Sequence, residues 1–166
     1  MLYWSTSMTE TYDAQPKSFE EAIDLVNSSP SLRKIKSQID NTELSADMKA
    51  VLYNIANVTV KIGESVIAAG RRIFEIATAL INKFPNLTIG TLVGLVVATV
   101  IGGTLGSITI AGVAPFAGLA ALLSKLVVLL GVGKGFIEDL RNNAAKVEMD
   151  HVAAQFNALG MGVVKS

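Results

Sequence analysis

The longest uncharged segment of the chain covers residues 84–124, and its 41 residues include no Asp, Glu, Lys or Arg. Lys125 interrupts it, and the uncharged sequence then resumes to Gly133. The segments on both sides are amphipathic and charged, so the apolar residues are strongly segregated along the chain. A segment this long and apolar must be buried by the rest of the fold or inserted into a lipid bilayer.

Small residues in this segment indicate a helix rather than a strand. Residues 87–105 lack turn residues at strand spacing, and the run is too long for one strand. Small residues recur at every fourth position, which places them on one helix face: Gly90, Gly94, Ala98, Gly102 and Gly106. Such a face lets a second helix approach closely, as small-xxx-small motifs do in membranes. We expect this small face to serve helix packing and oligomerisation.

Two apolar arms, residues 87–105 and 113–133, are predicted to form a helical hairpin with its tip near residues 106–112. Their 19 and 21 residues are close to the ~20 that a membrane-spanning helix needs. Basic residues near both ends and none at the tip favour a hairpin with both termini on the cytoplasmic side of a membrane. The predicted membrane-flanking residues are Arg71, Arg72, Lys83, Lys125, Lys134 and Arg141.

Capping signals predict two short amphipathic helices before the hairpin. Residues 18–21 (Ser-Phe-Glu-Glu) form a capping box, in which Ser18 accepts from the amide of Glu21 and the Glu21 carboxylate reaches back. Ser29 followed by Pro30 predicts the start of a second helix, because proline is favoured in a first turn. Asn41, followed by Thr42, is expected to end it.

A third, long helix is predicted from about Ser45 to Lys83. Its apolar residues recur at spacings of three and four from residue 48 to residue 80, which is typical of a helix. A continuous helix of this length would extend roughly 58 Å. Gly63 and Gly70 are its weak points, at about 1 kcal/mol each relative to alanine. We expect it to pack on a core, because its polar face is too weakly cationic for a membrane-surface helix.

These boundaries divide the chain into a flexible lead (1–17), an amphipathic helical region (18–84), the hydrophobic hairpin (85–133) and a C-terminal amphipathic helix with a tail (134–166). The predicted fold is all-α, with amphipathic helices around the central hairpin. All four prolines lie at proposed boundaries, which supports the helical interpretation. The amphipathic helices could wrap the two arms only in part.

Few residues suggest chemistry. The chain has no cysteine, and its one histidine, His151, lies near Glu148 and Asp150. A single imidazole on a helix is a weak sign of a metal site. Residues 131–135 only superficially suggest a phosphate loop, because the required spacing is absent. We therefore expect no enzymatic activity, cofactor, metal or small-molecule substrate, and the net charge of zero argues against nucleic acid as a partner.

Three functional hypotheses follow. The first is a membrane-inserting, homo-oligomeric protein that anchors in, perforates or forms a channel through a bilayer, plausibly encoded by a phage or virus. The second is a structural or internal, ejected protein of a virion or other helical assembly, and the third is a soluble helical bundle with the hairpin buried as its core. The layout is similar to the pore-forming domain of colicins and, more loosely, to hairpin-type phage holins. Colicin hairpins lie near the chain end, whereas 33 residues follow Gly133 here.

Overall fold

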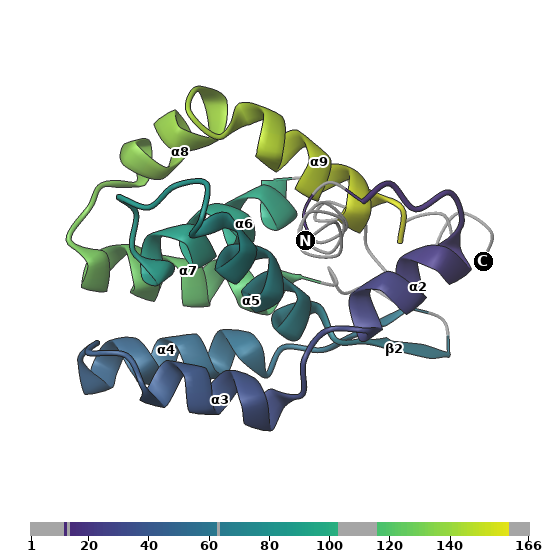
Figure 1. Cartoon of the computed structure of the whole chain (residues 1–166), viewed down its shortest axis with the longest axis horizontal. Coiled ribbons are helices and arrows are strands. Elements are labelled where there is room, and N and C mark those ends of the chain that lie inside the picture. Colours follow the sequence, from purple (N-terminus) through teal and green to yellow (C-terminus); the bar gives the residue numbers. More distant parts are fainter. Residues whose placement is uncertain (1–11, 13, 63, 103–115, 160–166) are drawn as a thin grey trace.

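The structure is a computed structural model, and it describes residues 12, 14–62, 64–102 and 116–159. These residues are mostly helical, so the predicted all-α class is confirmed (Figure 1). The helices in chain order are α2 (Phe19–Asn27), α3 (Leu32–Asp40), α4 (Ala46–Ala56), α5 (Ala69–Leu80), α6 (Ile89–Gly102), α7 (Ala117–Leu130), α8 (Lys134–Asn142) and α9 (Lys146–Asn157). Two short strands, β1 (Val60–Ile62) and β2 (Ser65–Ile67), separate α4 from α5.

The predicted capping box begins α2. The Ser18 hydroxyl accepts a hydrogen bond from the Glu21 amide (3.1 Å), and the Glu21 carboxylate accepts one from the Lys17 amide (3.0 Å). Both contacts satisfy amides that lack a partner within the helix, so they favour its start at this position.

The start of α3 corrects the expected cap at Ser29. The hydroxyl of Ser29 donates to the Val26 carbonyl at the end of α2 (2.8 Å), whereas Ser31 accepts from the Lys34 amide (3.2 Å). Pro30 therefore precedes the α3 cap instead of lying in the first turn of the helix. The predicted end is confirmed, because α3 ends at Asp40 with Asn41 as its C-cap.

The long helix predicted from Ser45 to Lys83 is wrong. Ser45 does cap α4, but α4 ends at Ala56, and β1 and β2 then form an antiparallel hairpin in which Val60 pairs with Ile67. Val60 and Ile62 are buried while Lys61 is exposed, which is the alternation of a strand. The Asn27 side chain also holds this hairpin against α2, since its amide donates to the Val66 carbonyl (3.1 Å) and its oxygen accepts from the Ala68 amide (2.9 Å).

Gly70 allows the start of α5 to lie directly against the end of α4. A Cβ atom at Gly70 would lie 2.0 Å from the Ile55 carbonyl oxygen, and the Gly70 amide donates to the Val58 carbonyl (2.9 Å). Two backbones meet at this point, so no larger residue fits without moving one of them. The glycine that weakens a continuous helix is instead required by the fold.

The single C-terminal helix expected after residue 134 is also wrong, because α8 and α9 are separate. The side chain of Asn143, the C-cap of α8, donates to the carbonyl (3.0 Å) and the carboxylate (2.8 Å) of Asp139, and the Ala145 amide donates to the Leu140 carbonyl five residues back (2.8 Å), so the regular helical pattern ends here. The backbone turns before α9 begins. Val147, in the first turn of α9, is 64% exposed.

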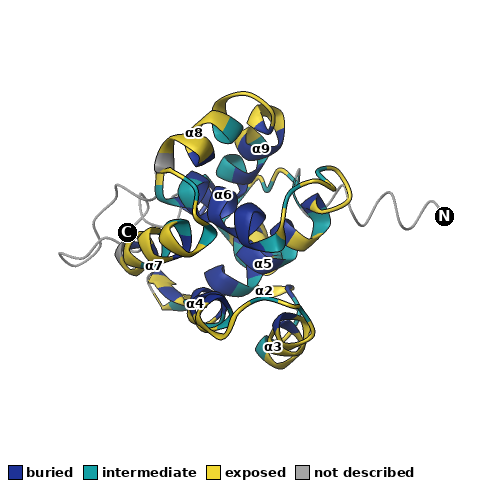
Figure 2. Cartoon of the chain, turned by 90° about the vertical axis from the view of Figure 1, so that its left-hand side faces the viewer, coloured by how far each residue is buried: buried dark blue, intermediate teal, exposed yellow. Residues whose placement is uncertain are grey.

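Helix α6 lies at the centre of the fold. Figure 2 shows it with α8 and α9 above, α5 and α7 to its sides, and α4 and α3 below. It packs against α5, α7, α8 and α9. Ten of its residues are buried: Gly90, Thr91, Leu92, Val93, Gly94, Leu95, Val96, Val97, Thr99 and Val100.

Candidate functional site

The two apolar arms pack side by side as the antiparallel pair α6–α7. A Cβ atom at Gly90 would lie 3.1 Å from Leu130 Cδ2, and one at Gly94 would lie 3.5 Å from Leu126 Cδ2. As residue numbers rise along α6, the numbers of the neighbouring α7 residues fall, so the two helices are antiparallel. The predicted tip of the hairpin, near residues 106–112, lies outside the described residues.

The small face of α6 is partly occupied by this pairing. At Gly90 it contacts α7 and Met48, and at Gly94 it contacts α7 and Ile137 of α8. Gly102, in contrast, has no heavy atom of the described residues within 4 Å of an added Cβ. Ala98 is half-buried, and Gly106 lies outside the described residues. The first half of the small face is therefore used for packing within the chain.

Helix α7 presents three faces to three different environments. The core face packs on the other helices and consists of Leu119, Leu122, Leu126 and Leu130. The groove face lines a hollow beside α8 and consists of Ala120, Leu123, Ser124 and Val127. The outer face is turned to solvent and consists of Gly118, Ala121, Lys125, Val128 and Leu129.

The outer face of α7 is apolar although it is exposed. Val128 is 78% exposed and Leu129 38%, and Lys125 is the only charged residue of the helix. A helix on the surface of a globular protein usually carries several charged or polar side chains on its solvent side. The outer face therefore has the composition of a contact surface rather than of a solvated one.

A groove lies on the inner side of the bend between α7 and α8, and we call it the elbow groove. The axes of Gly118–Leu130 and Gly135–Asn142 differ by 103°, after α7 ends at Gly131 in the left-handed conformation (φ 71°). The groove has a volume of about 650 Å³ and is lined by residues of α6, α7, α8 and α9. This groove was not predicted from the sequence, although Gly131, Gly133 and Gly135 mark the bend that forms it.

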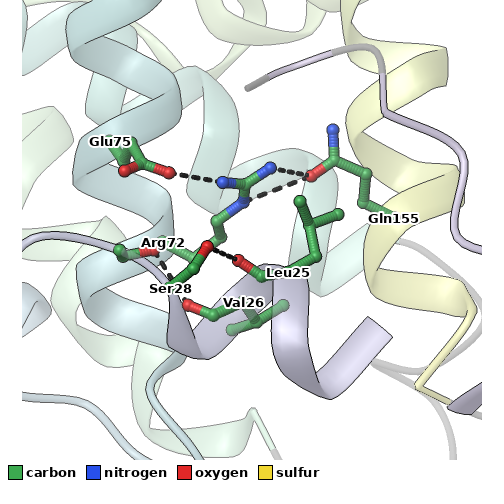
Figure 3. Close-up of polar contacts among 7 residues, drawn as sticks. Leu25, Val26, Ser28, Arg72, Glu75 and Gln155 are labelled. Atoms are coloured by element: carbon green, nitrogen blue, oxygen red, sulfur yellow. Dashed lines mark hydrogen bonds and ion pairs between the residues drawn. The ribbon is translucent and has the colours of Figure 1, made fainter. Parts of the chain in front are cut away.

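Arg72 connects α5 to α9 through a buried polar network (Figure 3). Its Nε and Nη2 atoms donate to Gln155 Oε1 (3.3 and 2.8 Å), and Nη1 forms an ion pair with Glu75. Burial lowers the pKa of Arg72, and the nearby Glu75 carboxylate opposes this shift. Arg72 was predicted to flank a membrane, but at 2% exposure it is a core residue in this fold.

The other predicted flanking residues are spread over several elements. Arg71 is half-buried and donates from Nη1 to the Pro30 carbonyl (3.4 Å), while Lys125 is exposed on α7. Lys134 is the first residue of α8. The structure therefore does not gather these residues into one belt.

Ion pairs hold α9 at two further points. Lys83 Nζ lies 2.9 Å from the carboxylate of the buried Glu148, and this hydrogen bond raises the pKa of Lys83. Asp150 pairs with Lys146 (2.8 Å) and with Arg141 of α8 (3.1 Å), and these contacts, with Lys146 contributing most, lower the pKa of Asp150. Together with Arg72, these contacts fasten α9 over α6.

The two acidic residues near His151 both take part in these ion pairs. Glu148 and Asp150 pair with cations, and His151 Nδ1 has no hydrogen-bond partner among the described residues. Within this part of the chain, no group of three or more His, Asp or Glu side chains could hold a metal ion.

Among the described helices, none is by itself long and apolar enough to cross a membrane. By length and composition alone, α7 and α8 could do so as a bent pair. Comparison with protein-family models, curated protein sequences and solved structures gave no match.

Proposed function

We propose that this protein binds lipid bilayers through the outer face of α7 and keeps the α6–α7 pair as an uncharged hairpin that can enter the membrane. The observation that carries the proposal is the exposed, apolar outer face on a helix whose only charge is Lys125. The long side chain of a lysine can reach the membrane–water boundary while its stem stays in apolar surroundings. A bilayer would cover this face without leaving a buried charge.

The polar groups of α6 support the same proposal. Its side chains include no charge, and the hydroxyl of Thr99 donates to the Leu95 carbonyl of its own helix (3.0 Å). At the start of α6, the hydroxyls of Thr88 and Thr91 bond to each other (3.0 Å). Because these groups are satisfied locally, transfer of α6 into hydrocarbon would not expose an unpaired hydroxyl.

Insertion would require rearrangement of the helices that surround the hairpin. Each arm has 14 helical residues, which gives a length of about 21 Å, less than the ~30 Å hydrocarbon core. We propose that the outer face binds first and that the arms lengthen when α8 and α9 leave α6. An antiparallel hairpin would keep both of its ends on the same side of the membrane.

Oligomerisation through the small face would follow this rearrangement. Gly90 and Gly94 are covered by α7 in the present fold, so a second copy could reach them only after α7 has moved. Several copies associated in this way could perforate the bilayer.

The test compares Val128→Glu with Val147→Glu in vesicle co-sedimentation and dye-release assays. Both valines are exposed, at 78% and 64%, so neither substitution removes core packing. We expect Val128→Glu to lose vesicle binding, because a carboxylate on the outer face would have to enter the membrane. Val147→Glu on α9 should bind like the unmodified protein, and circular dichroism checks that both variants are folded.

Two results would overturn the proposal. One is a failure of the unmodified protein to bind vesicles, and the other is equal binding by both variants. If the protein instead forms an oligomer without lipid, and Val128→Glu dissociates it in light scattering, the outer face is a contact between copies. That outcome would favour a structural subunit of an assembly.

A further inference from the structure

The elbow groove has the properties of a ligand site separate from the outer face of α7. We infer that it binds the acyl chain of a single-chain amphiphile with a zwitterionic head group. The hydrocarbon chain lies between α6 and α7, and the head group lies at the rim formed by α8. This inference does not depend on the proposed function, because an amphiphile dispersed as single molecules can enter the groove without a bilayer.

The walls of the groove are suited to hydrocarbon. They consist mainly of aliphatic side chains, including Ile101, Leu123, Val127 and Ile137. The two hydroxyls in the lining donate to carbonyls of their own helices, Thr99 to Leu95 (3.0 Å) and Ser124 to Ala120 (3.2 Å). The walls therefore place little demand on a ligand for hydrogen bonds, and burial of methylene groups supplies the binding energy.

The size of the groove matches a small ligand. Its volume of about 650 Å³ lies inside the range of roughly 300–1,000 Å³ that is usual for such sites. Residues of four helices line it, so a chain lying in it would contact several elements at once.

The rim of the groove carries one charge of each sign. Glu138 and Arg141 lie three residues apart on α8, and Asn142 follows them. Arg141 Nη2 is 3.1 Å from Asp150, but a guanidinium has five N–H donors, so the group can also bind a phosphate. A zwitterionic head group places its phosphate at Arg141 and its ammonium group at Glu138. A fatty acid has no cationic group that could pair with the Glu138 carboxylate.

The experiment measures binding of lysophosphatidylcholine to the full-length protein by calorimetry and native mass spectrometry, below the micelle-forming concentration. We expect one molecule per chain. Removing two methylenes from the ligand should weaken binding by about 15-fold, since each buried methylene contributes about fourfold. A fatty acid of equal chain length should bind more weakly than the zwitterion.

Two exposed helical alanines supply matched variants. Ala120 of α7 lines the groove, whereas Ala50 of α4 lies neither in the groove nor on the outer face of α7. Ala120→Phe should fill the groove and weaken binding at least tenfold, whereas Ala50→Phe should bind like the unmodified protein. Equal binding by both variants, no binding by the unmodified protein, or equal affinity for the fatty acid would overturn the inference. None of these results bears on vesicle binding by Val128→Glu.

Discussion

The two arms of the hairpin, α6 and α7, have the same length and similarly apolar sequences but different surroundings. Helix α6 is buried almost completely, while α7 is buried on its core face, borders the elbow groove on a second face and meets solvent on the third. The difference comes from the other helices. Amphipathic helices pack on α6 from both sides, and no described residue covers the outer face of α7.

The contrast shows that apolar sequence alone does not decide burial. The sequence contains too few amphipathic residues to enclose two apolar helices, and the expectation of partial wrapping is confirmed by the exposed faces of α7. Three helices, α5, α8 and α9, pack on α6 and bury most of it, whereas α7 packs on α4 and α6 and keeps one face exposed. The exposed arm is therefore the one available for contacts outside the chain.

The largest difference in stability between variants of the two arms should come from truncation of a leucine side chain in each. Leu95→Ala in α6 should lower the free energy of unfolding by about 2–5 kcal/mol, because it leaves a cavity beneath fully buried side chains. Leu129→Ala in α7, where the side chain is 38% exposed, should cost less than about 1 kcal/mol. Urea denaturation measures both, and equal losses would contradict the different burial of the two arms.

Arg72→Met tests what holds α9 over α6. The substitution removes the cation that pairs with Glu75 and donates to the buried Gln155, and we expect a loss on the order of 2–4 kcal/mol. Relative to the unmodified protein, the substitution should accelerate amide hydrogen exchange more in α9 than in α4. Arg71→Met is the matched control, because Arg71 makes one 3.4 Å contact with Pro30, and its effect should stay near 0.5 kcal/mol. If the two variants are equally stable, the network does not hold α9.

Two glycine substitutions test how far the small face of α6 is covered by α7 and α8. Gly94→Leu should cost about 1–3 kcal/mol, because its side chain would extend into Leu126 and Ile137, which already lie within 3.8 Å of an added Cβ. Gly102→Leu should be tolerated, because an added Cβ meets no heavy atom of the described part of the chain within 4 Å. Thermal unfolding of both variants gives the comparison, and a strong destabilisation by Gly102→Leu would show that the small face is covered beyond Gly94.

Local signals in the sequence were sufficient for the helical class, the two apolar arms and several helix starts. The Ser18 cap and the helix start near Ser45 are correct, because a helix start depends on residues only three positions away. The antiparallel arms followed from two apolar helices joined by a short connection. These features depend on neighbouring residues, which the sequence contains in full.

Tertiary contacts decided the remaining features. Spacings of three and four continue through residues 57–68, yet Asn27 and the close approach at Gly70 stabilise a β-hairpin there. Arg72 could equally have been a surface cation, until Gln155, 83 positions away, supplied a buried acceptor. The sequence determined which helices are apolar, whereas the packing of α5, α8 and α9 on α6 decided that α6 is enclosed, while α4 covers one side of α7 and its outer face stays exposed. The physical reason is that burial depends on which distant segments share a surface, and periodicity within one segment does not specify its partners.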